Sequence, residues 1–238
     1  MSNSAISTGA PGVSLRSSSR IQASSAGWPR RHTPAGFPDP KACGAFYDTR
    51  TTIFAGDEMM TLEYSSVEAQ RDLFDRAIEA LPPHGRIFDL GCGLGHLPAY
   101  FDEKGIPFDA YHGIDVSPAM VQRARERFVG RDAFRFAVQD VLSEPLSPGI
   151  ADVGYIISVL GYPIGDDPME SMMGILREVF DACQDGIVFT HLVDGRKPGL
   201  KFTSDPETLA ALCEKRLNAR ATIHDNGVDF TYLLALRH

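Results

Sequence analysis

Short β-prone segments alternate with helical segments through the middle of this 238-residue chain. The β-prone segments are residues 87–90, 110–116, 134–138, 152–159 and 186–192. Apolar residues recur at helical spacing in residues 96–104, 118–128, 172–183 and 205–217. This alternation predicts a doubly wound α/β sheet, because each helix carries the chain back to a strand that pairs in parallel.

Two further β-prone segments, residues 219–225 and 228–236, flank the dipeptide Asn226-Gly227. Asn-Gly is a strong signal for a β-hairpin, because both positions of the tight turn favour a positive φ. The expected fold class is therefore α/β, with a doubly wound Rossmann-like sheet that is mostly parallel and ends in a C-terminal antiparallel hairpin strand.

The first 38 residues differ in composition from the rest of the chain. They contain nine serines and four arginines but no aspartate or glutamate, so they carry a net charge of +4, whereas residues 39–238 carry −12. A segment without apolar periodicity buries too little surface to offset the entropy of ordering, so residues 1–38 are expected to be a disordered tail. The same composition is typical of transit peptides, which makes an organelle the alternative to a cytoplasmic location.

Residues 39–238 are expected to form one domain, with an N-terminal lid segment and helix at 39–84 and an α/β core at 85–238. Ser65 and Glu68 have the spacing of a capping box. They precede an apolar helical stripe that Pro82-Pro83 terminates. The fold is therefore expected to begin with a short helical lid.

Composition also bears on the class of partner. No run of 18 apolar residues is present, so no membrane-spanning helix is expected. The acidic domain argues against nucleic acid, whose binding requires a basic surface. The cysteines at 43, 92, 183 and 213 form no Cys-x-x-Cys pair, so reduced thiols and no metal site are expected. A small molecule is the expected substrate, and the oligomeric state is left open.

A glycine-rich loop from Asp89 to His96 follows the first predicted strand. Glycines between a strand and a helix allow the backbone to approach a ligand closely. The dinucleotide fingerprint would need glycine at position 96, and a Walker loop would need Gly-Lys-Ser or Gly-Lys-Thr. Asp115 and Asp140 close the next two strands, where carboxylates suit a ribose and an adenine. The spacing favours a nucleoside with a cationic tail over a dinucleotide.

With these features the chain resembles the class I S-adenosylmethionine-dependent methyltransferases. The similarity lies in IFDLGCGLG at 87–95, YHGIDVSPAMVQRARERF at 111–128, FAVQD at 136–140 and the terminal hairpin. It covers residues 62–238 and implies methyl transfer with S-adenosylmethionine as the cofactor. The cofactor-binding residues that it implies are Asp89, Gly91, Cys92, Gly93, Asp115, Val116, Met120, Asp140, Val141 and Ser158.

Individual roles follow from the same resemblance. Asp115 would bind the ribose diol, Val116 would flank the adenine, and Asp140 would accept the adenine amino group. Ser158 would border the methionine portion. The alternatives are that Asp89 only caps or braces the loop, that Asp115 and Asp140 are solvated loop carboxylates, and that Cys92 only packs.

Residues 62–74, LEYSSVEAQRDLF, further resemble a helix that precedes the fold in a bacterial subgroup of these enzymes. There an aromatic residue and a Gln-Arg pair close over the cofactor, which implies this role for Tyr64, Gln70 and Arg71. Tyr64 stands where the subgroup usually has tryptophan. The alternative is an ordinary solvated helix face.

His191, at the end of the fifth predicted strand, is the candidate catalytic base, with a structural histidine as the alternative. Arg196, Lys197 and Lys201 follow it and are candidates to bind a substrate carboxylate or phosphate, with a solvated loop as the alternative. Residues 158–162 lack the Asn/Asp-Pro-Pro-Tyr motif of enzymes that methylate amino groups in DNA or protein glutamine.

The predicted function is therefore transfer of a methyl group from S-adenosylmethionine to an oxygen or nitrogen atom of a small-molecule acceptor, a natural product or metabolite. Two rivals stay open from the sequence. One is a nicotinamide-dependent oxidoreductase on a similar sheet, and the other is a non-catalytic partner subunit that binds the cofactor.

Overall fold

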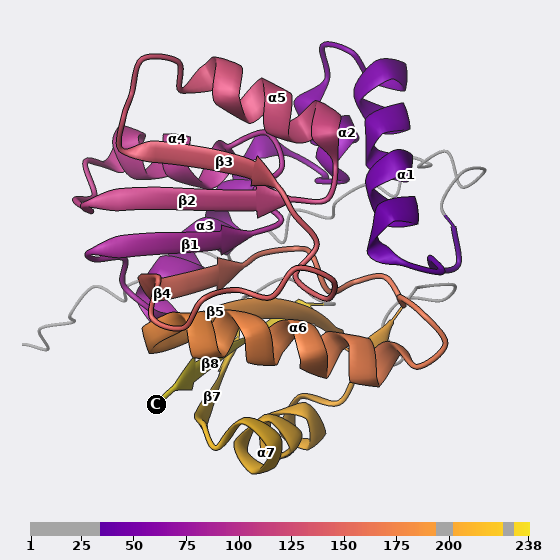
Figure 1. The fold of residues 1–238 in the computed structure, drawn as a ribbon, viewed down its shortest axis with the longest axis vertical. Coiled ribbons are helices and arrows are strands. Elements are labelled where there is room, and N and C mark those ends of the chain that lie inside the picture. Colours follow the sequence, from indigo (N-terminus) through magenta and orange to yellow (C-terminus); the bar gives the residue numbers. More distant parts are fainter. Residues whose placement is uncertain (1–33, 194–201, 226–230) are drawn as a thin grey trace, which may run out of the picture. The chain divides into compact units, whose positions relative to one another are not determined.

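A computed structural model describes residues 34–193, 202–225 and 231–238. Within these residues one β-sheet has the strand order β3-β2-β1-β4-β5-β8-β7, and the short strand β6 pairs with β5 outside that path (Figure 1). The strands are β1 (Arg86–Leu90), β2 (Ala110–Asp115), β3 (Phe134–Val138), β4 (Ala151–Ile156), β5 (Cys183–Val193), β6 (Thr203–Ser204), β7 (Arg220–Asp225) and β8 (Thr231–Arg237).

The strand directions confirm the predicted sheet. β1 pairs in parallel with β2 and β4, β2 with β3, and β4 with β5. β8 lies antiparallel between β5 and β7. The predicted Asn226-Gly227 turn lies outside the described residues. The order reverses between β1 and β4, and ligands of doubly wound sheets bind at the carboxyl ends of the strands beside such a reversal.

Helices cover both faces of the sheet. Apolar residues of α3, α4 and α5 form a core on one face, and those of α6 and α7 form a core on the other. Figure 1 shows α6 in front of the sheet and α4 behind it. The helices are α1 (Pro40–Ile53), α2 (Glu58–Leu62), α3 (Val67–Ala80), α4 (His96–Lys104), α5 (Pro118–Arg127), α6 (Pro168–Ala182) and α7 (Pro206–Leu217).

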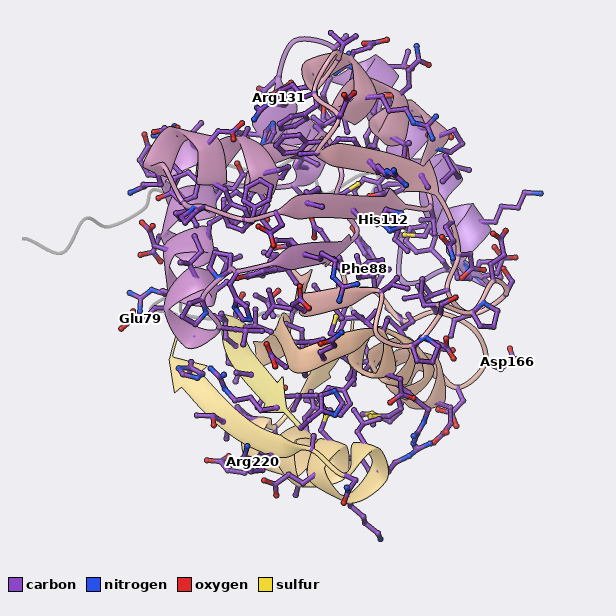
Figure 2. All side chains as sticks on the ribbon, turned by 60° about the vertical axis from the view of Figure 1, so that its left-hand side comes forward. Glu79, Phe88, His112, Arg131, Asp166 and Arg220 are labelled. Atoms are coloured by element: carbon purple, nitrogen blue, oxygen red, sulfur yellow. The ribbon has the colours of Figure 1, made fainter. Side chains whose placement is uncertain are left out.

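Strand β1 is apolar on both faces because helices cover both. Ile87 packs into the core beneath α3 to α5, and its neighbour Phe88 packs into the core beneath α6 and α7. Phe88 stands beside His112 of β2, with ring centroids 5.6 Å apart in an edge-to-face arrangement (Figure 2). Burial on two faces therefore holds the strand whose end carries the glycine-rich loop.

The lid segment contains two helices that the sequence analysis did not distinguish. α1 begins at Pro40, where the Asp39 side chain accepts the N–H of Ala42 at 2.7 Å. α2 begins after Asp57, whose side chain accepts the N–H of Met60 at 2.9 Å. Aspartate caps and a proline in the first turn are ordinary signals of a helix start, so both helices had a signature in the sequence.

The predicted capping box was wrong by one residue. Ser66, not Ser65, caps α3, because its hydroxyl accepts the N–H of Ala69 at 3.1 Å. A cap side chain reaches the amide three residues ahead, which leaves Glu68 in the first turn of the helix, where its charge favours the helix dipole.

Phe37, which the sequence analysis assigned to the tail, is buried. Its N–H donates to the carbonyl of Pro163 and its carbonyl accepts from Gly165, each at 2.9 Å. Its ring packs 5.5 Å from that of Phe46 and 5.1 Å from that of Tyr162, measured between centroids. The packed part of the chain therefore begins before Pro38, while residues 1–33 lie outside the described residues.

Candidate functional site

A cavity opens at the carboxyl ends of the parallel strands. Residues directly after β1, β2, β3 and β4 line it, together with residues of α1, α3, α4 and α6. It holds about 1080 Å³ of empty space, including the part that is open to solvent. A hollow at this edge of a doubly wound sheet is the usual place for a cofactor or small-molecule ligand.

The glycine-rich loop forms the floor of this cavity. Gly91, Gly93 and Gly95 all have positive φ, at 75°, 52° and 75°. The N–H groups of Gly91 and Cys92 donate to the carbonyl of Ile114 at 2.7 and 3.0 Å, which fastens the loop to the end of β2. A side chain with a Cβ would not adopt this course easily, because positive φ favours glycine. The loop therefore brings its backbone to the cavity surface.

Asp115 ends β2 at the edge of the cavity and is buried. Its Oδ2 accepts the N–H of Gly93 at 3.0 Å, and its Oδ1 accepts the N–H of Ser117 at 2.9 Å. Burial raises the pKa of Asp115, and these backbone hydrogen bonds oppose that effect. Each carboxylate oxygen has a second lone pair. The fixed carboxylate can therefore still accept two hydrogen bonds from a ligand.

Asp89 lies beneath the loop, in β1, and also lines the cavity. Tyr111 of β2 donates its hydroxyl hydrogen to Oδ2 of Asp89. Burial raises the pKa of Asp89 to about 7; the Tyr111 hydrogen bond opposes this effect and the charge of Asp115 adds to it. A cation bound nearby would favour the charged form of Asp89.

Asp140 and Val141, after β3, line the same cavity as Val116 and Met120. Asp140 is partly buried, and its Oδ1 accepts the N–H of Leu142 at 3.0 Å. The predicted residues Asp89, Gly91, Cys92, Gly93, Asp115, Val116, Met120, Asp140, Val141 and Ser158 all line one cavity, and Tyr64 and Gln70 join them. Tertiary folding thus gathers the predicted cofactor set at a single place.

Tyr64 connects the lid to the end of β4. Its hydroxyl donates to Oγ of Ser158 at 3.0 Å. Ser158 has a φ of 60°, and its N–H donates to the hydroxyl of the buried Thr190 at 2.7 Å. A positive φ is unfavourable for serine, so the surrounding bonds must hold this conformation. Burial raises the pKa of Tyr64 to about 12, which keeps its hydroxyl protonated at neutral pH.

A polar network at His96 ties the lid to the core. His96 Nδ1 lies 2.9 Å from Oε1 of Gln70 in α3, and Nε2 lies 2.8 Å from Oε2 of Glu58 in α2. Arg127 of α5 donates to both oxygens of Glu58, at 2.7 and 3.0 Å. Burial lowers the pKa of His96. His96, which stands where a dinucleotide fingerprint requires glycine, thus anchors the lid to the core.

Helix α1 is fastened to the start of α5. Oδ1 of Asp48 accepts the hydroxyl of Ser117 at 2.6 Å and the N–H of Ala119 at 3.0 Å. A Cβ on Gly44 would lie only 2.3 Å from the carbonyl oxygen of Val116. The absence of a side chain at Gly44 therefore lets α1 rest directly on the backbone beside Asp115.

Two predicted site residues lie elsewhere. Arg71 is exposed, pairs with Glu103 of α4 and is not among the residues that line the cavity. His191 is buried in β5 against the rings of Phe202 and Tyr232, at 5.3 and 5.9 Å between centroids, and does not line the cavity either. The structure therefore does not bring Arg71 or His191 to the site, while Arg196, Lys197 and Lys201 lie outside the described residues.

Several lining residues escaped the sequence analysis. Tyr47 and Cys43 come from α1, Leu62 from the end of α2, and Ile164 from the loop after β4. The hydroxyl of Tyr47 donates to Oε2 of Glu63 at 3.0 Å. These residues carry no motif, because the packing of the lid on the core selects them. The aspartate cap and the proline in the first turn of α1 indicate a helix here, but not which of its residues line the cavity.

The cavity fits a nucleoside that lacks a pyrophosphate. A Cβ on Gly93 would lie 3.1 Å from Leu62 and 3.8 Å from the Met120 sulfur, so the missing side chain lets Leu62 of the lid approach the loop closely. Two carboxylates with spare lone pairs, Asp115 and Asp140, face the same space. No lysine or arginine is found among the described residues that line it.

Neither a metal centre nor a membrane helix was found in the described ranges. They contain no group of three or more His, Cys, Asp and Glu side chains able to hold a metal ion. None of the helices in that part of the chain is long and apolar enough to cross a membrane.

The sequence is similar to proteins described as methyltransferases. Residues 88–189 match a family described as a methyltransferase domain. A protein of Mycobacterium tuberculosis named as a methyltransferase is 31% identical over 165 residues, which are 67% of this chain and 97% of that protein. The malonyl-acyl-carrier-protein O-methyltransferase of Pectobacterium atrosepticum is 28% identical over 132 residues, which are 54% of this chain and 47% of that enzyme.

Solved structures share the fold at low sequence identity. The 4+2 cyclase SpnF superposes with a TM-score of 0.63 at 16% identity, covering 86% of this chain and 97% of its own. Magnesium protoporphyrin IX methyltransferase from Synechocystis PCC 6803, with S-adenosylmethionine bound, superposes with a TM-score of 0.59 at 15% identity, covering 87% and 100%. At such identities the similarity concerns the fold.

Proposed function

Because this chain belongs to the class I S-adenosylmethionine-dependent methyltransferases, we propose that it methylates an oxygen or nitrogen atom of a small-molecule acceptor in the cavity at the strand ends. S-adenosylmethionine is its methyl donor. Family membership decides against the nicotinamide-dependent oxidoreductase that the sequence alone left open. We also propose that the reaction takes place in the cytoplasm.

The observation that carries the proposal is the charge of the cavity wall. Asp89, Asp115 and Asp140 line the cavity, and no lysine or arginine of the described chain does so. Three carboxylates in the wall repel a phosphate, whereas a ribose diol and a cationic tail are bound by such hydrogen-bond acceptors. The wall therefore suits S-adenosylmethionine and disfavours a nucleic acid as the acceptor.

Each carboxylate has a distinct task in this proposal. Asp115, held by Gly93 and Ser117, accepts the two ribose hydroxyls with its remaining lone pairs. Asp140 accepts the adenine amino group. Asp89, under the glycine loop, faces the cationic part of the cofactor. The bound cofactor supplies a methyl group that is already activated on a sulfonium sulfur.

The remaining work of the protein is alignment and exclusion of water. Tyr64 closes over the cavity by its bond to Ser158, and Glu58 and Gln70 fasten the lid to His96. Holding an acceptor and a methyl donor in line in a dry site lowers the barrier by several kcal/mol, on the order of what intramolecular reactions achieve. These contacts of Tyr64, Glu58 and Gln70 therefore position the acceptor.

Calorimetric binding of S-adenosylmethionine, of its demethylated product and of NAD tests the cofactor assignment. Asp115→Ala should weaken binding of the methyl donor by about a hundredfold, because two hydrogen bonds to a charged group, each contributing roughly 1.5 kcal/mol, are lost. Asp72→Ala, on the exposed side of α3, is the control and should bind as the wild type does. Binding of NAD without the methyl donor, or unchanged binding by Asp115→Ala, would overturn the proposal.

Transfer of the labelled methyl group tests the acceptor class. The purified chain is incubated with labelled donor and separate small-molecule, protein and RNA fractions of a cell extract. Label is expected in the small-molecule fraction, as an ether, ester or N-methyl product. Label confined to RNA or protein would refute the small-molecule assignment, and absence of transfer by a chain that binds the donor would favour a partner subunit.

A further inference from the structure

We infer that Tyr47 and Glu63 form a proton relay that accepts the proton of a hydroxyl group on the acceptor, so that the acceptor is an apolar alcohol or phenol. The inference rests on the proposed methyl transfer and assigns a base to it. It concerns the end of the cavity formed by α1, by the end of α2 and by the loop after β4, which we call the acceptor end; its lining residues are Pro40, Cys43, Tyr47, Leu62 and Ile164.

Glu63 is the centre of a hydrogen-bonded group beside the acceptor end. Its Oε2 accepts the hydroxyl of Tyr47 at 3.0 Å. The hydroxyl of Tyr162 donates to Oε1 at 3.0 Å and to Oε2 at 2.8 Å. Glu63 itself ends α2 with a φ of 64°, a conformation that is unfavourable for glutamate. Three elements of the fold thus converge on one carboxylate.

Only one of the two tyrosines lines the cavity. Tyr47 does so, whereas Tyr162 and Glu63 are not among the lining residues. Tyr47 therefore stands between the cavity and the carboxylate. It can accept a hydrogen bond from a ligand on its oxygen while its own hydrogen is directed to Glu63.

The remainder of the acceptor end is apolar. Pro40, Leu62, Ile164 and the weakly polar thiol of Cys43 line it, and the centroid of the Tyr47 ring lies 5.2 Å from that of Phe46. An apolar wall with one hydroxyl suits an acceptor that has a hydrocarbon or aromatic body and a single polar group. The nearby charge of Glu63 disfavours an anionic acceptor.

A base in the site indicates which kind of polar group the acceptor carries. A carboxylic acid is already ionised at neutral pH and would be repelled by Glu63. A neutral amine attacks through a nitrogen lone pair and keeps its protons while the new bond forms, so a base speeds its methylation less than that of an alcohol. An alcohol or phenol keeps its proton until the new bond forms and therefore gains most from a base within reach.

Other candidate bases around the cavity are committed to the lid. His96 has one ring nitrogen at Gln70 and the other at Glu58, and the hydroxyl of Tyr64 is directed to Ser158. His191 does not line the cavity. At the acceptor end, Tyr47 with Glu63 combines a place in the wall with a proton acceptor behind it.

The proton and electron changes balance across this relay. The acceptor oxygen forms a bond to the methyl carbon, and the carbon–sulfur bond of the donor breaks with its electron pair left on sulfur. The hydroxyl proton passes to the Tyr47 oxygen as the Tyr47 proton passes to Oε2 of Glu63. The sulfur loses a positive charge and Glu63 loses a negative charge, so no further reactant is needed.

The raised pKa of Tyr47 agrees with a role in passing a proton to Glu63 and not with a phenolate that removes the acceptor's proton by itself. Burial raises the pKa of Tyr47 well above its usual value, and the charge of Glu63 raises it further. Tyr47 therefore stays protonated at neutral pH and can transfer a proton only while it receives one. The proton ends on Glu63.

The matched control is built into the structure, because two tyrosines bind the same carboxylate. Tyr47→Phe breaks the relay, Glu63→Gln removes its final acceptor, and Tyr162→Phe removes one bond to Glu63 but keeps the path from the cavity. Each variant is first titrated with S-adenosylmethionine. Full donor binding shows that the variant is folded and separates failure of the relay from failure of the proposed function.

Binding of three naphthalene probes to the enzyme saturated with demethylated cofactor is the first measurement. 2-Naphthol should bind the wild type at least tenfold more tightly than 2-naphthoate, and 2-naphthylamine should bind more weakly than the naphthol. Glu63→Gln should reduce the preference for naphthol over naphthoate about tenfold. Equal binding of naphthol and naphthoate, binding of none of the probes, or an unchanged preference in Glu63→Gln would overturn the inference.

Methylation of 2-naphthol is the second measurement. General bases typically contribute roughly a hundredfold or more to the rate. Tyr47→Phe and Glu63→Gln should therefore lower kcat at least about thirtyfold with little change in KM, whereas Tyr162→Phe should lower it less than about fivefold. Equal losses in the two tyrosine variants would show that Tyr47 only supports the lid, and wild-type rates in Glu63→Gln would exclude the relay.

Discussion

Substitution of Asp89 by asparagine should remove a specific pH dependence from the stability of the protein. Asp89 is 3% exposed, and burial raises its pKa to about 7 from an ordinary value of 3.8. Between these two values the folded protein holds a proton that the unfolded chain has released. The free energy of unfolding must therefore fall as the pH rises through this range.

The size of the effect follows from the two pKa values. The difference of about 3 pH units corresponds to about 4 kcal/mol in total. Between about pH 5 and about pH 8 the Asp89 contribution should fall by about 2.5 kcal/mol, because over most of that interval the folded protein still holds the proton that the unfolded chain has released. Asparagine cannot ionise, but its Oδ1 can still accept the hydroxyl of Tyr111, so Asp89→Asn should lack this fall.

Urea unfolding of the cofactor-free protein, followed by far-ultraviolet circular dichroism, measures the difference. Wild type and Asp89→Asn are compared at both pH values, since subtraction removes the contribution of all other titrating groups. Asp72→Asn is the control; Asp72 is exposed and pairs with Arg76 one turn away. Its change should stay within about 0.5 kcal/mol at either pH.

Parallel plots of unfolding free energy against pH for the wild type and Asp89→Asn would refute this reasoning. If wild type and Asp89→Asn lost the same stability between the two pH values, Asp89 would be charged in the folded protein throughout. The Asp89 carboxylate would then not be the buried group that a cationic ligand has to ionise.

The remaining predictions concern the lid. Gly44→Ala should lower the thermal unfolding temperature. A Cβ 2.3 Å from the Val116 carbonyl oxygen costs roughly 1–3 kcal/mol, which exceeds the gain of about 1 kcal/mol or less in helix propensity. A higher unfolding temperature would contradict the close contact. Arg71→Ala should bind S-adenosylmethionine within about twofold of the wild type in calorimetry, because Arg71 is exposed and paired with Glu103. Gln70→Ala should weaken that binding at least about fivefold, because its partner His96 anchors the lid; the reverse order would place Arg71 at the cofactor.

The sequence predicted the sheet because its signals are local. β1 and β2 are apolar runs that end at a glycine or before a serine and a proline, and helices of the expected length follow them. Hydrophobic periodicity and punctuation by glycine and proline report on such elements directly. Local signals do not give exact boundaries, as the capping error at Ser65 and the burial of Phe37 show. The exact residue at which an element begins depends on contacts with the rest of the fold.

The residues that we propose to bind the cofactor could be located in the sequence for the same reason. Asp115 and Asp140 stand at the ends of successive strands, and the topology of a doubly wound sheet brings such ends together whatever the details of packing. Gly91 and Gly93 are required by the positive φ of the loop. A residue whose position follows from topology can be found without knowledge of its neighbours.

The acceptor end was not predictable, since it depends on where the lid comes to rest. Arg71 and Gln70 are adjacent in the sequence, yet α3 turns Gln70 to His96 and leaves Arg71 exposed. Tyr47 and Tyr162 are 115 residues apart in the chain and meet at one carboxylate of Glu63. No local pattern encodes such a meeting.

The α/β class, the glycine loop and the strand-end acids could thus be predicted from the residues alone, since they follow from local propensity and sheet topology. The packed fold was needed to show which lid residues face the cavity, that His191 does not line it, and that Glu63 stands behind Tyr47. Side-chain direction on a packed helix is set by the surface that the helix buries, and that surface belongs to distant parts of the chain.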